Sequence, residues 1–286
     1  MYKCLSPGAI NVSANSAQEA IQAARIGGFG GVEINPFEIA DLIDKDGVSA
    51  VRALYTEAGI QPAAFGLPVE WRKDEETWKQ GLEKLPRAAK AANAIGAGRT
   101  FTWILSCSDT RPLEENLAFH IERFTPIAQI LADNGCELGL EFLGPKTLRE
   151  MLPHPFLYKM FDMLELGEKI GDNVGILLDC WHWHTSEGTV ADLEKLRPEQ
   201  VTYVHVNDAP KGVAMDDHID NVRGLPGETG VIDIVGFLGT LKKIGYTGAV
   251  TPEPFKNELK ELPDDTARLK TVGDTMTRIF QLAGLE

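Results

Sequence analysis

The chain has 286 residues, of which 43% are hydrophobic and 24% are charged, as is usual for a globular protein with a full core. Its 42 acidic and 28 basic residues give a net charge of −14, which argues against a nucleic-acid partner because such binding depends on neutralising phosphates. The four cysteines show no CxxC spacing, so we expect neither a disulfide framework nor a zinc-thiolate cluster. Without a signal-like N-terminus or a run of about 18 apolar residues, we expect no membrane partner and a cytoplasmic location.

Short β-rich runs alternate with helix-periodic segments along the chain. The expected strands are Tyr2–Leu5, Gly31–Asn35, Gln61–Leu67, Arg99–Leu105, Glu137–Leu143, Val174–Asp179, Val201–Asn207 and Gly248–Phe255. The expected helices are Ser16–Ile26, Asp46–Ala58, Asp74–Ile95, Leu113–Asn134, Pro155–Ile170, Val190–Leu196, Asp233–Ile244 and Asp265–Leu282. Eight strand–helix units predict an α/β fold, a single (β/α)8 TIM barrel over residues 1–286. An open doubly wound sheet is the alternative, but no Gly-rich dinucleotide fingerprint follows the first strand.

Ionisable side chains fall at the ends of four consecutive expected strands. In a barrel, successive strand residues alternate between the interior and the helix layer. The leucines of the fifth strand must pack under helices, so Glu141 points inward. The same counting turns Asp179, His205 and Glu253 inward near the carboxyl ends of the next three strands. Chemistry in TIM barrels sits at this face.

Three unpaired carboxylates at one point would repel one another and shift their pKa values strongly. A divalent cation removes this conflict. Ligation by Glu141, Asp179, His205 and Glu253, rich in oxygen with one imidazole, suits Mn²⁺ best, with Mg²⁺, Co²⁺ or Zn²⁺ as further candidates. The structural alternative is that Glu141 pairs with a lysine and His205 is a hydrogen-bonded core histidine.

Five motifs in the second half resemble the xylose isomerase-like TIM-barrel superfamily, and within it the inosose isomerase and tagatose/psicose 3-epimerase groups. They are GLEFLG at 139–144, GILLDCWHWH at 175–184, YVHVNDAP at 203–210, RGLPGETGVID at 223–233 and GYTGAVTPEPF at 245–255. The resemblance implies the same four metal ligands. It also implies that Glu141 and Glu253 act as catalytic acid/base groups and that His182 and Arg223 contact substrate oxygens.

Several residues keep more than one interpretation. His182 can instead orient Asp179, and Arg223 can be a solvated surface residue in the long loop 208–232. Trp103, with Trp181 and Trp183, can form an apolar wall for a sugar ring or pack between helix and strand. Lys146 can reach a substrate oxygen or phosphate, or remain exposed. His184 is unassigned, Glu33 is the only acidic candidate in the first half, and Cys180 is expected to be a packing residue.

The leading functional hypothesis is a metal-dependent isomerase or epimerase acting on a small keto-sugar, keto-inositol or related polyol. A lyase on the same scaffold, similar to inosose dehydratase or cleaving keto-glycosides, needs the same proton abstraction. An AP-endonuclease-like nuclease needs extra histidines from early strands, and the first 100 residues contain none. A non-catalytic sugar-binding barrel would not need the two glutamates. Barrels of this kind are often dimers or tetramers, and the sequence is compatible with a homo-oligomer.

Overall fold

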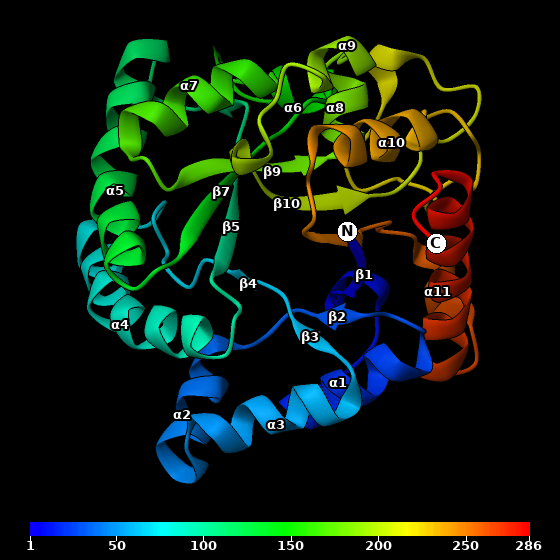
Figure 1. Ribbon diagram of the computed structural model, residues 1–286. Coiled ribbons are helices and arrows are strands. Elements are labelled where there is room, and N and C mark those ends of the chain that lie inside the picture. The colour runs from blue at the N-terminus through cyan, green and yellow to red at the C-terminus, as the bar shows by residue number, and fades with distance from the viewer.

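The computed structural model describes residues 1–286, in which parallel strands form a closed ring surrounded by helices (Figure 1). The strands of the ring are β1 (Tyr2–Leu5), β2 (Gly31–Val32), β3 (Gln61–Pro62), β4 (Phe65–Gly66), β5 (Arg99–Ile104), β7 (Glu137–Phe142), β9 (Val174–Asp179), β10 (Val201–Val206) and β11 (Ala249–Pro252). Their order is β3-β2-β1-β11-β10-β9-β7-β5-β4. β3 and β4 are two parts of one extended segment, so this segment pairs with β2 at its start and with β5 at its end. The sheet therefore closes on itself as a (β/α)8 TIM barrel, which confirms the predicted fold.

Helices cover the outside of the ring. The longer ones are α1 (Ala17–Ile26), α2 (Pro36–Asp46), α3 (Val48–Ala58), α4 (Glu75–Ala94), α5 (Leu113–Asp133), α7 (Met160–Ile170), α10 (Ile234–Ile244) and α11 (Asp265–Leu282). Short helices α6 (Lys146–Arg149), α8 (Cys180–Thr185) and α9 (Val190–Leu193) lie in the connections after β7 and β9. None of the helices is both long enough and apolar enough to cross a membrane.

The side chains divide into an interior and an outer core, as the predicted alternation requires. Leu138, Leu140 and Phe142 of β7 belong to the large core between strands and helices. Leu177 and Tyr203 belong instead to a small cluster inside the ring, with Cys4, Ala63, Ala64 and Ala249. The inward direction expected for Glu141, Asp179 and His205 follows from the same alternation.

One helix was missed, and several predicted boundaries were wrong, including the end of β2, which stops at Val32 rather than Asn35. Residues 36–46 form α2, because Asn35 caps the amides of Phe37 and Glu38, and Gly47, with φ of 84°, separates α2 from α3. α7 starts at Met160 rather than Pro155, since His154–Pro155 (β8) pairs antiparallel with Cys107–Ser108 (β6). β11 stops at Pro252, where Pro252 and Pro254 remove amide donors. The expected third strand is divided into β3 and β4, because its first part pairs with β2 and its second part pairs with β5.

The contact between α1 and α11 depends on a residue without a side chain. A Cβ on Gly273 would overlap the carbonyl oxygen of Gly27. We expect Gly273→Ala to lower the free energy of unfolding by about 2–3 kcal/mol, because two backbones must separate. Urea unfolding checks this, with Gly239→Ala on α10 as the control, since no atom lies within 4 Å of that Cβ. Equal stability of the two variants would contradict the argument.

Candidate metal centre and substrate cavity

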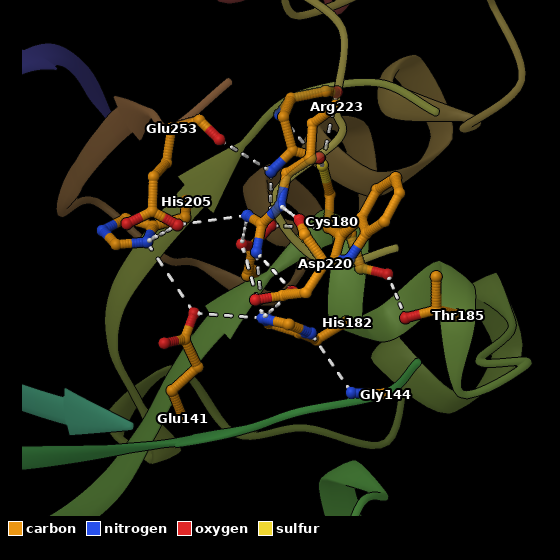
Figure 2. A network of polar contacts seen from close by, with 12 residues as sticks. Glu141, Gly144, Cys180, His182, Thr185, His205, Asp220, Arg223 and Glu253 are labelled. Atoms are coloured by element: carbon orange, nitrogen blue, oxygen red, sulfur yellow. Dashed lines mark hydrogen bonds and ion pairs between the residues drawn. The ribbon is translucent and has the colours of Figure 1, made fainter. Parts of the chain in front are cut away.

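The four side chains predicted at the strand ends meet in one buried cluster. Ligand-type atoms of Glu141, Asp179, His205 and Glu253 all lie within 4.8 Å of one another. His205 on β10 is in register with Asp179 on β9, while Glu141 and Glu253 come from β7 and from the residue just after β11. Figure 2 shows Glu141, His205 and Glu253 turned toward a common centre. The sequence therefore placed these four residues together correctly.

Backbone and amide donors fix Asp179 at the end of its strand. Its Oδ1 atom accepts hydrogen bonds from Trp181 N at 2.8 Å and from Asn207 Nδ2 at 2.9 Å, so Asp179 also caps the short helix α8. Oδ2 is left to face the cluster. Asn207 lies one residue beyond β10, and its amide therefore links two neighbouring strand ends.

The pKa shifts reflect the crowding of buried charges in this cluster. Burial, followed by the neighbouring Glu253, raises the pKa of Glu141 well above its ordinary value. Burial would raise the pKa of Glu253 too, but His205 and Arg223 outweigh it and lower that pKa. Burial would lower the pKa of His205, yet Glu253, Glu141 and Asp179 together raise it to about 10. The buried carboxylates thus favour any cation that can lie among them.

The hydrogen bonding of the cluster fits a divalent metal ion. Glu141 Oε1 and both ring nitrogens of His205 are buried without a hydrogen-bond partner. His205 Nδ1 lies 3.4 Å from Glu253 Oε2 and 3.8 Å from Glu141 Oε1, neither with hydrogen-bond geometry. Buried polar atoms without a partner are costly unless a further group binds them. Carboxylate oxygens and one imidazole nitrogen are a suitable ligand set for Mn²⁺, Mg²⁺, Co²⁺ or Zn²⁺.

Arg223 enters this cluster from the loop between β10 and α10. Its Nη1 atom lies 2.7 Å from Asp179 Oδ2 and 3.1 Å from Glu253 Oε2. Only 5% of the residue is exposed, so it is not a solvated surface arginine. Trp181 and Phe255 lie 5.3 and 4.8 Å from its guanidinium carbon, within the range of cation–π attraction. The loop therefore delivers a buried cation to the edge of the candidate metal centre.

His182 on α8 presents a hydrogen-bond donor beside Arg223. The Gly144 amide donates to His182 Nδ1 at 3.1 Å, and burial lowers the pKa of this histidine, which keeps the ring neutral. The proton is therefore on Nε2, which lies 3.3 Å from Arg223 Nη2, another donor. Two donors cannot bond to each other. Figure 2 shows them side by side, so an acceptor atom placed there would bind both.

The structure shows no hydrogen bond between His182 and Asp179. His182 Nε2 lies 4.0 Å from Asp179 Oδ2, and Asn207 and Trp181 N hold Asp179 instead. The geometry thus favours a ligand-facing His182 over the alternative in which it orients Asp179.

A cavity of about 330 Å³ opens above the cluster. Its polar lining comes from Glu141, His182, Asp220, Asn221, Arg223 and Glu253, and its apolar lining from Trp103, Leu105, Leu143, Leu148 and Phe255. Trp103 is in register with Glu141 and is 38% exposed, while Arg72 covers its ring at 3.9 Å. This cavity has the size of a small-molecule site, with one polar and one apolar side.

Other residues considered from the sequence lie outside this cavity. Lys146 Nζ is paired with Asp216 Oδ2 at 2.7 Å, so the structure does not bring it to the cluster. Trp181 and Trp183 are buried, the latter against Phe237 of α10. His184 lies beside His218, and Cys180 is buried against Asn207. Glu33 accepts hydrogen bonds from Ser6 and Tyr203 inside the ring.

Asp220 and Phe255 are among the residues of the site that escaped sequence reasoning. Asp220 lines the cavity and binds Arg223, but it lies in an acidic stretch, MDDHID, that gives no reason to single it out. Phe255 takes a left-handed backbone, with φ of 40°, right after Pro254. A strained non-glycine residue often marks a functional site, but strain leaves no trace in the sequence.

The close approach of Gly144 to α8 gives a test of the His182 tautomer. A Cβ on Gly144 would collide with Thr185 Oγ1, His182 O and Ser186 N. We expect Gly144→Ala to move its amide away from His182 Nδ1 and to raise KM about tenfold, as loss of an orienting partner often does. Steady-state kinetics on a substrate that the enzyme turns over measures this, with Gly8→Ala as a control in open space. An unchanged KM would show that this hydrogen bond does not matter.

A closed barrel with this cluster at the carboxyl ends of its strands defines a TIM-barrel protein with a candidate metal centre. The chain belongs to the xylose isomerase-like TIM barrel family, whose family model matches residues 21–272. The prediction of the family from its five motifs is confirmed.

Curated relatives and a solved structure agree with the family. Inosose isomerase of Halalkalibacterium halodurans is 27% identical, covering 77% of this chain and 75% of its own length. L-ribulose 3-epimerase of Methylomonas sp. is 24% identical, covering 86% and 81%. 3-dehydroshikimate dehydratase of Pseudomonas aeruginosa is 27% identical, covering 86% of this chain but 37% of that protein. A solved xylose isomerase domain protein of Alicyclobacillus acidocaldarius is 30% identical, covering 99% of both chains with a TM-score of 0.84.

Proposed function

We propose that this protein is a divalent-metal-dependent isomerase or epimerase acting on a small keto-polyol, such as a keto-sugar or keto-inositol. One observation carries the proposal: Glu141 and Glu253, from strands separated by β9 and β10, line the same cavity as the donors His182 and Arg223. Relatives named inosose isomerase and L-ribulose 3-epimerase support this reaction class. The same proposal treats residues 1–286 as one catalytic domain, since one core includes residues from β1 to α11.

The chemistry requires a proton to leave and return at a carbon next to a carbonyl group. A divalent cation held by Glu141, Asp179, His205 and Glu253 would polarise the carbonyl and the adjacent hydroxyl, which acidifies the C–H bond. Glu141 or Glu253 takes the proton, and the same or the other glutamate returns it. His182 Nε2 and Arg223 Nη2 donate to a substrate oxygen and hold it in place. The apolar side of the cavity limits the access of water.

The charges around the cavity favour an uncharged substrate. Glu141, Asp179, Asp220 and Glu253 carry four negative charges when ionised, whereas Arg223 and one divalent cation supply three positive ones. Lys146 is paired elsewhere with Asp216. A phosphate or carboxylate group would therefore meet no uncompensated cation, and like charges oppose its binding. The hydroxyl groups of a neutral polyol can form hydrogen bonds with the same side chains without this repulsion.

A lyase or dehydratase is the second candidate, because it begins with the same proton abstraction and differs only in what leaves. The similarity to 3-dehydroshikimate dehydratase supports this chemistry. The substrate in that relative's name is an acid, however, and the excess of carboxylates here favours a neutral one. We place isomerisation or epimerisation first for that reason. Mn²⁺ is the first metal to test, since oxygen ligands dominate the set.

Incubation in D₂O with Mn²⁺ tests the proposal directly. The panel should contain inososes, ketohexoses and 3-keto-glycosides, followed by NMR and mass spectrometry. Solvent deuterium in a rearranged product supports an isomerase or epimerase. Loss of water or of an aglycone supports the lyase. Absence of exchange with every member and every metal tested would contradict both.

A further inference from the structure

Asp220 is a carboxylate of the cavity that belongs to neither the metal cluster nor the two acid/base glutamates. It lies in the loop between β10 and α10, three residues before Arg223. Its Oδ1 atom accepts a hydrogen bond from Arg223 Nη2 at 2.8 Å, and its main-chain oxygen accepts one from Arg223 Nε at 2.7 Å. One residue thus satisfies two of the three nitrogens of the guanidinium.

These two bonds determine where the third nitrogen can go. A guanidinium is planar, so fixing Nε and Nη2 fixes Nη1 as well. Nη1 then lies on Asp179 Oδ2 and Glu253 Oε2, which belong to two of the four candidate metal ligands. Trp181 and Phe255, which both lie near the guanidinium, restrict its plane further. Asp220 therefore sets the distance between Arg223 Nη1 and the carboxylates of Asp179 and Glu253.

The loop holds Asp220 in place by contacts outside the cavity. Thr147 Oγ1 donates to the main-chain oxygen of His218 at 2.7 Å, and Lys146 pairs with Asp216. Both anchors are on α6. His218 is 2% exposed while Ile219 is 59% exposed, and the imidazole of His218 packs against Trp181 and His184, which ties this part of the loop to α8.

Asp220 also resolves a conflict of charge. Arg223 is buried, and without Asp220 its remaining ion-pair partners would be Asp179 and Glu253, the same carboxylates that a divalent cation requires. Removing one partner of a buried ion pair leaves an uncompensated charge, which is costly, so we expect the guanidinium to move closer to these two carboxylates. The guanidinium would then compete with the metal for those oxygens, and Nη2 would leave its place beside His182 Nε2.

We propose that Asp220 is the positioning residue of this site: it holds Arg223 so that a divalent cation and the guanidinium share Asp179 and Glu253, while Nη2 and His182 Nε2 face one substrate oxygen. This inference rests on the proposed function, since it presupposes the metal and the polyol. It adds a residue outside the five motifs, in a loop that can differ among barrels with the same ligands.

A double-mutant cycle on metal binding tests the proposal without any substrate. Mn²⁺ affinity is measured by titration calorimetry for the wild type, Asp220→Ala, Arg223→Gln and the double variant. We expect Asp220→Ala to weaken Mn²⁺ binding about tenfold in the wild type and to change it less than twofold when Arg223 is already glutamine. Asp220→Asn, which keeps an acceptor but not the charge, should fall between wild type and alanine.

The alternative is that Asp220 attracts the cation only as one more negative charge. In that case the loss would be equal in both backgrounds, and the proposal would be overturned. Asp217→Asn removes a charge from an exposed position of the same loop that lies outside the cavity lining, and it is expected to leave Mn²⁺ affinity unchanged. Circular dichroism and urea unfolding show whether each variant is folded, and Asp220→Asn serves if the alanine variant is not.

Kinetics supply a second readout. We expect Asp220→Ala to raise KM about tenfold at saturating Mn²⁺, because the paired donors lose their alignment, with a smaller change in kcat. The outcomes separate the two proposals. A wild type that binds no divalent cation contradicts the proposed function, whereas a wild type that binds Mn²⁺ with Asp220→Ala unaffected contradicts this inference alone.

Discussion

Replacing Glu141 with glutamine is expected to lower proton exchange and turnover about 10³-fold at saturating metal, and Glu253→Gln to do the same. A positioned acid/base group contributes about 10² to 10⁴-fold. Glutamine keeps the size of the side chain and an oxygen that can still bind a cation, but it cannot accept the substrate proton. Deuterium incorporation in D₂O measures the exchange step itself, separately from product release.

Glu137→Gln provides a matched control on the same strand. Glu137 is on the same face of β7 as Glu141 but lies exposed at the opposite end of the barrel. Its replacement should leave exchange unchanged. The metal content of each variant must be measured, so that loss of a ligand is not mistaken for loss of a base. If both glutamine variants exchange deuterium at the wild-type rate, the acid/base roles of Glu141 and Glu253 are wrong and another group must carry the proton.

Most of the barrel could be predicted because its strands are buried on both sides. Runs such as Ile176-Leu177-Leu178 between polar residues indicate a strand whatever surrounds them. The missed elements depend on partners distant in sequence. β6 and β8 are two residues each and exist only because Cys107 and Ser108 pair with Pro155 and His154. Two residues carry no periodicity, so nothing local predicts them.

Helix α2 is a different kind of omission, because its start was readable. Asn35 followed by Pro36 and then Glu38 is a standard beginning of a helix, with a capping side chain, a proline in the first turn and an early acidic residue. The neighbouring strand was extended through Asn35 instead. Residues 33–35 can either extend the strand or lead into the helix, and the capping of the helix by the Asn35 side chain favours the second.

The cluster of Glu141, Asp179, His205 and Glu253 was predictable because the two-residue period of strands fixes the direction of each side chain, and parallel strands end at one face. Asp220 was not, since a loop has no period to count along. Its role comes from the path of residues 208–232 across the barrel mouth, which depends on anchors at α6. The same holds for Gly144, whose amide sets the His182 tautomer through a contact 38 residues away.

Binding of a divalent cation is expected to stabilise the protein, and Asp179→Asn is expected to abolish this effect. A ligand that binds only the folded state at 100 times its Kd adds about 2.7 kcal/mol. For a chain of this length that corresponds to a rise in Tm of about 5 °C. The physical source is the cluster itself, in which buried carboxylates and unpaired acceptors lack a partner until a cation binds.

Thermal unfolding with Mn²⁺ and with EDTA gives the difference in Tm between the two conditions for each variant. The variants are compared by this difference and not by their absolute Tm. The asparagine side chain in Asp179→Asn can still cap α8 through its oxygen, so the fold should persist, but its amide nitrogen cannot bind a cation. Asp172→Asn is the control, because Asp172 is exposed near the opposite end of β9. It should keep the full shift. If Asp179→Asn keeps the full rise in Tm, the cation binds elsewhere. If the wild type shows no rise in Tm with Mn²⁺, Mg²⁺, Co²⁺ or Zn²⁺, the buried carboxylates are neutralised by His205, Arg223 and protons alone.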